Sequence, residues 1–153
     1  MNIDDINNLL FNPIWSGKLL HHFLSGACRS KSKRIKFELI YFALPFINDD
    51  IIFEQLIKCK NTSTFSSLFK SPDTKNNLIK KHDQIAAYKN ITDNAIIYLG
   101  NKISISIDDF IQISDLVKYQ NEDELLRSYC KAAFYLGIIL TKEDYRNIFL
   151  RVG

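Results

Sequence analysis

Along most of the chain, apolar residues recur every three or four positions, which is the spacing that places them on one face of an α-helix. This periodicity predicts about six or seven helices. The second of them is apolar on almost every side, so we expect its neighbours to enclose it. The predicted helices cover residues 13–27, 36–47, 49–60, 65–69, 75–90 and 121–140, followed by a short terminal helix that ends near Leu150.

Residue types that begin helices stand at the start of several of these segments. Asn12 and Pro13 begin the first helix, and residues 48–50 are suited to cap the third. Thr74 can cap the helix that follows it, and Asn121 can cap the last long one. The apolar side of helix 75–90 then consists of Leu78, Ile79, His82, Ile85 and Ala86, which predicts that His82 lies at the edge of the core.

One segment alternates instead of following the helical period. Ile103, Ile105 and Ile107 are separated by serines, as in a half-buried β-strand, and a turn over residues 92–98 and a Gly-Asn turn signal precede them. Helices followed by one small hairpin resemble the outline of a winged-helix unit, in which the hairpin is the wing. The sequence therefore predicts a mainly α fold, namely a single compact helical domain over residues 1–153 with one small β-hairpin.

Composition narrows the class of protein. The chain has 153 residues, 46% apolar and 12% aromatic, which suits one folded domain and excludes a disordered chain. No apolar run approaches the ~18 residues of a transmembrane helix, and the first residues lack the basic region of a signal peptide. Three cysteines without a CxxC pair favour neither disulfides nor a zinc ribbon. We therefore expect a cytoplasmic protein with reduced thiols and no membrane contact.

No residue pattern typical of catalysis or cofactor binding occurs in the chain. GxSxG, P-loop, GxGxxG and HExxH strings are all absent. His21 and His22 are adjacent, so on a helix they point about 100° apart and cannot both face one metal ion. His82 is either a hydrogen-bonded residue or the base of a small hydrolase, and the first is favoured because no nucleophile accompanies it. We therefore predict no enzyme activity, no catalytic, cofactor-binding or metal residues, and no cofactor.

The formal net charge of +3 comes from the first half of the chain. No acidic residue stands between Ile6 and Phe37. Such a stretch can neutralise DNA phosphates, contact an acidic protein surface, or simply be solvated. Because the net charge is small, we favour the protein contact over DNA. We call its cations the basic segment: Lys18, Arg29, Lys31, Lys33, Arg34 and Lys36.

Small residues line one side of the predicted helix 121–140. Cys130, Ala133 and Gly137 are spaced at i, i+3 and i+7, and Phe134 lies beside them. This candidate packing face would let another helix approach closely. The rest of the helix is also apolar, so it must be enclosed either by its own domain, which we favour, or by a partner.

Five short segments carry a family resemblance. They are Phe11–Ile14, Phe42–Phe46, Thr92–Ile96, Cys130–Gly137 and Asn147–Gly153. In this order and spacing they resemble the middle component of bacterial three-component ABC systems, which includes the small accessory subunit of Lamassu anti-phage defence. The resemblance implies a non-catalytic adaptor that binds an SMC/Rad50-like ABC ATPase and couples it to an effector, often a nuclease, when foreign DNA is sensed. Contact with DNA would then be indirect, through the complex.

A second hypothesis is a free winged-helix DNA-binding protein or transcriptional repressor. It requires a basic recognition helix beside the hairpin. The sequence before the hairpin offers chiefly Lys80, Lys81 and Lys89, with Asp83 and Asp93 among them. This weak basic character makes the adaptor the favoured hypothesis.

Overall fold

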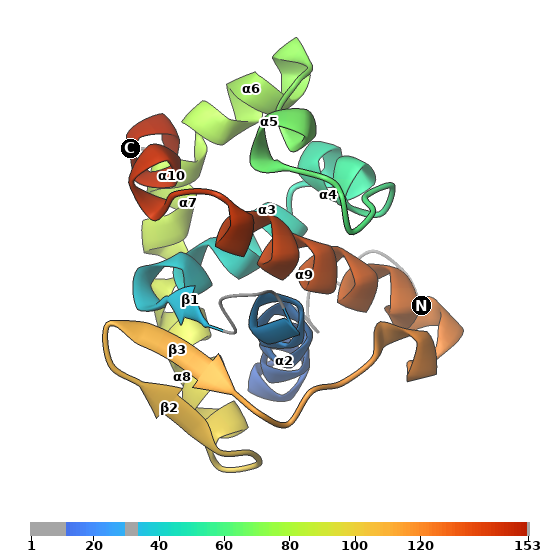
Figure 1. Ribbon diagram of the computed structural model, residues 1–153, viewed down its shortest axis with the longest axis vertical. Helices are drawn as coiled ribbons and strands as arrows, with labels where there is room; N and C mark the ends of the chain where they lie inside the picture. Colours follow the sequence, from blue (N-terminus) through green and yellow to red (C-terminus); the bar gives the residue numbers. More distant parts are fainter. Residues whose placement is uncertain (1–11, 30–33, 153) are drawn as a thin grey trace.

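Two long helices, α2 (Pro13–Arg29) and α9 (Glu124–Lys142), cross at the centre of the structure (Figure 1). The computed structural model describes residues 12–29 and 34–152. α9 runs across the middle of the view, with α2 and a small sheet on one side and the helices of residues 50–79 on the other. The crossing is therefore the part of the core around which the other elements pack.

The α2–α9 crossing depends on two glycines. A Cβ atom on Gly26 would lie 2.0 Å from the carbonyl oxygen of Phe134, and one on Gly137 would lie 2.0 Å from the carbonyl oxygen of Phe23. Both distances are far shorter than a van der Waals contact, so the two backbones touch where any other residue would push them apart.

The predicted helix 36–47 is helical, but it consists of two kinds of helix. Its first part, η1 (Phe37–Phe42), is a 3₁₀ helix, and α3 (Ala43–Ile47) continues it as an α-helix. Pro45 lies in the first turn of α3, where an α-helix tolerates proline. All five residues of α3 are buried, as the apolar sequence predicts.

Shorter helices complete the helical part of the fold. Asp49 caps the helix that follows it, as predicted, because its carboxylate accepts hydrogen bonds from the N–H groups of Ile51 and Ile52. Of these shorter helices, those of residues 50–79 lie on the side of α9 away from α2, whereas the helix of residues 89–100 packs beside α2 behind the small sheet (Figure 1). The helices are α4 (Asp50–Leu56), α5 (Phe65–Leu68), α6 (Pro72–Ile79), α7 (Lys81–Ala87), α8 (Lys89–Gly100) and α10 (Tyr145–Val152).

The prediction of one helix over residues 75–90 is wrong in its boundaries and in the side chains that it expects to face the core. Ser71 rather than Thr74 caps α6, since the Ser71 hydroxyl accepts a hydrogen bond from the N–H of Thr74. A break between α6 and α7 changes the direction in which the later side chains point, so the apolar stripe of one continuous helix does not persist. Ile79 is 70% exposed, and His82 is also exposed rather than at the core edge.

A small antiparallel sheet has the strand order β1-β3-β2. Its strands are β1 (Ile35–Lys36), β2 (Ile105–Ile107) and β3 (Phe110–Ile113), and Ile35 and Ile107 both pair with Ile111. The predicted hairpin is therefore present, and β1 adds an edge strand that two residues are too few to reveal in sequence. Along the chain the order is helix, strand, several helices and then two strands.

The fold is mainly α, as predicted, but it contains more helices than the six or seven expected from the sequence. Residues 12–29 and 34–152 contain nine α-helices, because helix 75–90 splits and because α8 is a full helix where only a turn was predicted. Asn121 ends η2 (Tyr119–Asn121), a 3₁₀ helix, so Asp123 and not Asn121 stands at the start of α9. Within the described part of the chain, no helix is long and apolar enough to cross a membrane.

Replacing Gly137 with alanine should destabilise the protein, because the new methyl group must push two helix backbones apart. We expect a loss of about 1–3 kcal/mol in the free energy of unfolding, measured by urea denaturation. Gly100→Ala is the matched control, since its Cβ would find nothing closer than an Ile105 methyl at 3.9 Å. Equal stability of the two variants would contradict the role given to the crossing.

Candidate functional site

Two cations of the basic segment rest on aromatic rings at the edge of the sheet. The guanidinium of Arg34 lies 4.1 Å from the centre of the Phe110 ring. The ammonium of Lys36 lies 5.5 Å from the same ring, 5.3 Å from the Tyr145 ring and 3.9 Å from a carboxylate oxygen of Glu38. The charged groups therefore stay near the surface. The methylene chain of Lys36 and the flat guanidinium of Arg34 cover the aromatic rings beneath them. Lys31 and Lys33 lie outside the described residues.

The other two described cations of the basic segment are exposed on α2. Lys18 Nζ lies 2.7 Å from Glu122 Oε2, and the guanidinium of Arg29 lies 5.8 Å from the Phe134 ring. The hydrogen bond to Glu122 raises the pKa of Lys18. Burial would raise the pKa of Glu122, but Lys18 and His22 together lower it. The partners of Lys18 and Arg29 are thus within the chain.

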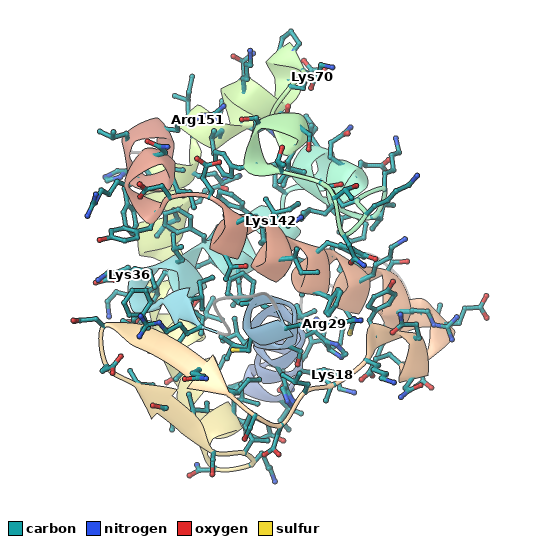
Figure 2. The ribbon with its side chains drawn as sticks, viewed as in Figure 1. Lys18, Arg29, Lys36, Lys70, Lys142 and Arg151 are labelled. Carbon is teal, nitrogen blue, oxygen red and sulfur yellow. The ribbon has the colours of Figure 1, made fainter. Side chains whose placement is uncertain are left out.

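Further cations lie outside the basic segment. Figure 2 shows the labelled cations spread from α2 to the far end near α6 rather than gathered in one row. Lys142 donates hydrogen bonds to the carbonyl oxygens of Asn61 and Ser63, and Arg151 lies 4.9 Å from the Phe65 ring. The labelled cations are therefore dispersed, and several have partners within the chain. They are Lys18, Arg29, Lys36, Lys70, Lys142 and Arg151.

The candidate packing face of α9 lies against α2. Cys130, Ala133 and Gly137 are fully or almost fully buried, and the backbone of α2 fills the space beside Gly137. The Phe134 ring packs on Tyr119, with their centres 5.4 Å apart. Burial raises the pKa of the Cys130 thiol to about 12, so this thiol is neutral near pH 7. The helix that approaches closely belongs to the chain itself.

The helix before the hairpin, α8, presents little free positive charge. Lys89 lies 2.8 Å from Asp93, one turn along α8, and the largest exposed apolar side chain on this helix is Ile97. Of the other lysines considered for a recognition helix, Lys80 is exposed, but Lys81 is buried and lies 2.6 Å from Asp49. Two of the three cations are therefore neutralised by partners within the protein.

The buried Lys81 joins three helices, and the sequence analysis did not find this role. Asp49, at the start of α4, accepts hydrogen bonds from Lys81 Nζ at 2.6 Å and from Asn77 Nδ2 at 3.0 Å. Burial would raise the pKa of Asp49, but Lys81, the N–H of Ile52 and Asn77 together lower it. A cavity of about 410 Å³ opens beside these groups, and its polar lining is Asn48, Asp49, Asp50, Asn77, Gln84 and Tyr88.

The adjacent histidines face different partners. His21 Nε2 lies 2.6 Å from the carbonyl oxygen of Asp115, whereas His22 is buried and its Nε2 lies 3.1 Å from Glu122 Oε1. Burial lowers the pKa of His22 although Glu122 opposes the shift. His22, Glu122 and Lys18 thus connect α2 to the segment that leads into α9.

Large apolar side chains stand exposed on separate helices. Leu150 on α10 is 81% exposed and Leu125 on α9 is 70% exposed, in addition to Ile79 on α6. Helical periodicity cannot find such residues, because it only says which face is apolar and not which face stays uncovered. They are candidate contact points for another protein.

A comparison with protein families identifies the class of this protein. Residues 1–153, the whole chain, match the family model described as ABC-three component (ABC-3C) system Middle Component 3. The chain belongs to this family of middle components. No curated protein and no solved structure matches it significantly.

Replacing Lys81 with methionine should strongly destabilise the fold, because it leaves the Asp49 side chain, which is only 9% exposed, without its cation. We expect a loss of about 3–5 kcal/mol at pH 7, against at most about 0.5 kcal/mol for the exposed control Lys80→Met. The measurement is urea unfolding of both variants.

The loss of folding stability caused by Lys81→Met should also depend on pH. Since the folded state lowers the pKa of Asp49, the ionised carboxylate stabilises the wild type above its unfolded pKa of about 4, and this contribution is lost as the pH falls through the folded pKa. The gap between wild type and Lys81→Met should therefore narrow below about pH 4. A constant gap from pH 7 to pH 3 would argue against the ion pair as its cause.

Proposed function

We propose that this chain is a non-catalytic adaptor subunit of a bacterial anti-phage or anti-plasmid defence complex. In this role it binds an SMC/Rad50-like ABC ATPase in the cytoplasm and couples it to an effector such as a nuclease. Membership of the middle-component family over the full length carries the proposal. The small accessory subunit of Lamassu systems is the member type that the sequence resembles.

The surface chemistry supports binding to proteins. Exposed apolar side chains such as Leu150 and Ile79 offer burial energy to a partner. Asp49 and Lys81, a largely buried pair, have a structural role, with Asp49 capping a helix and accepting a hydrogen bond from Lys81. An adaptor needs such surfaces and a stable fold, not a reactive group.

The alternative, a free winged-helix DNA-binding protein, has one observation in its favour. The helices are followed by one small hairpin, β2 and β3, which resembles the outline of a winged-helix unit. The helix that would read the major groove, α8, has its Lys89 paired with Asp93 and exposes Ile97. Phosphate binding requires free cations, so this surface favours the adaptor.

The adaptor proposal predicts a stable complex. Co-expression with the ABC ATPase encoded beside it should give one complex that survives affinity purification and gel filtration. The chain alone should show neither ATPase nor nuclease activity. A monodisperse chain that fails to associate with this ATPase, or that binds one DNA sequence selectively at physiological salt, would count against the adaptor.

The basic segment should act in assembly rather than on DNA. Because one surface ion pair contributes only about 0–1 kcal/mol, five cations must be changed together to glutamine. We expect weaker retention of the chain in the complex. We also expect an unchanged slope of log affinity against log salt for DNA binding by the complex that remains intact. The changed residues are Arg29, Lys31, Lys33, Arg34 and Lys36.

A matched variant separates a specific effect from a general loss of charge. It changes five cations outside the basic segment to glutamine and should be retained like the wild type. Full retention of the basic-segment variant, with a slope flattened by roughly 0.9 for each lost phosphate contact, would assign these cations to DNA instead. The control residues are all exposed: Lys58, Lys60, Lys75, Lys80 and Lys102.

A further inference from the structure

Three side chains that can bind metal ions meet beside the α2–α9 crossing. His22 comes from α2, Glu122 from the segment between η2 and α9, and Cys130 from α9. One donor atom from each lies within 4.8 Å of the other two. His22 is 1% exposed and Cys130 is completely buried, so two of the three donors are held by the packed core.

We propose that His22, Glu122 and Cys130 form a zinc-binding site. An imidazole nitrogen, a thiolate and a carboxylate are the ligand types that zinc takes, and a thiolate disfavours magnesium or calcium. Bond lengths of about 2.0–2.3 Å in a tetrahedral site place the donors about 3.3–3.8 Å apart. The donor atoms, which lie within 4.8 Å of one another, must therefore approach by up to about 1.5 Å, and water can supply the fourth ligand on the side where Glu122 reaches the surface.

The charges of the site suit a divalent cation. The ammonium of Lys18 now lies 2.7 Å from Glu122 Oε2, which marks the place where positive charge is stabilised. The Lys18 side chain is 42% exposed, so it can move into solvent when a metal ion takes its place. The Cys130 thiol would release its proton to solvent on binding, and the thiolate and the carboxylate would then balance the two charges of the ion.

The two nitrogens of the His22 ring face different directions. Nε2 lies 3.1 Å from Glu122 Oε1, so Nε2 is the nitrogen that would bind the ion. Nδ1 is buried on the other side of the ring and has no hydrogen-bond partner among the described residues. Nδ1 would carry the ring proton when Nε2 binds the ion.

The other cysteines offer no comparable site. Cys28 Sγ lies 3.4 Å from the backbone N–H of Ile113, and Cys59 Sγ lies 3.3 Å from the carbonyl oxygen of Gln55. Over residues 12–29 and 34–152, no second group of three metal-ligating side chains comes equally close. Cys28, which is also buried, is therefore a matched control for Cys130.

Cobalt titration of the full-length, reduced chain tests the site, because the absorption spectrum of bound Co²⁺ depends on which atoms coordinate the ion. We expect one Co²⁺ per chain, a visible spectrum typical of tetrahedral coordination, and a thiolate charge-transfer band in the near ultraviolet, all removed by added Zn²⁺. Cys130→Ser should lose the thiolate band and bind at least about tenfold more weakly. Cys28→Ser should keep both the band and the affinity.

A second variant tests the site without disturbing the core. Lys18→Met removes the competing ammonium and should bind Co²⁺ several-fold more tightly, with circular dichroism confirming that each variant is folded. If the chain is obtained only with its partners, the zinc content of the purified complex should fall by one ion per chain in Cys130→Ser and not in Cys28→Ser. A folded wild type that takes up no Co²⁺, an unchanged band in Cys130→Ser, or equal zinc in the two complexes would overturn the proposal.

Discussion

The contact between the backbones of α2 and α9 is the constraint on which the rest of the fold depends. Gly26 and Gly137 each lie where a single methyl group would collide with the carbonyl oxygen of the facing helix. This close approach brings the large side chains on either side into one continuous core, in which Phe23, Phe46 and Phe69 are completely buried. The sheet and the short helices then pack on a pair whose spacing is already set.

Polar contacts hold the remaining segments to this core at a few points. Asp49 and Lys81 join α4 to α7, and Glu122 with Lys18 and His22 joins α2 to the segment before α9. Ion pairs of this kind add little where solvent reaches them, but a buried carboxylate needs its cation, so the Asp49 contact specifies one arrangement of the helices. These contacts also remove charges from the surface that the sequence would suggest are free.

Which charged side chains are paired within the chain and which remain free on the surface bears on what the protein does. A middle component of an ABC-three component system has to present surfaces to other proteins, and this chain exposes apolar residues on α6, α9 and α10 among dispersed cations. The hairpin that follows its helices does not by itself imply DNA recognition, because function depends on the surface carried by a fold and not on the fold. The helix before the hairpin, α8, has its Lys89 paired with Asp93 within the chain.

The sequence by itself determined the features that depend on neighbours along the chain. These are the helical class, the strand at Ile105, the cap at Asp49 and the small residues of α9 that allow a close helix. It also carried the family resemblance, because short segments keep their identity whatever surrounds them. Hydrophobic periodicity did not predict the buried face correctly where a break between two helices changed the direction of the side chains. His82, for example, is exposed.

Only the tertiary structure decided which distant residues meet. The pairing of Lys81 with Asp49 and the meeting of His22 with Glu122 and Cys130 join segments far apart in sequence. No local pattern encodes such distances, because the packing of whole helices sets them. For the same reason, the structure decided that α2, and not a partner, covers the small residues of α9.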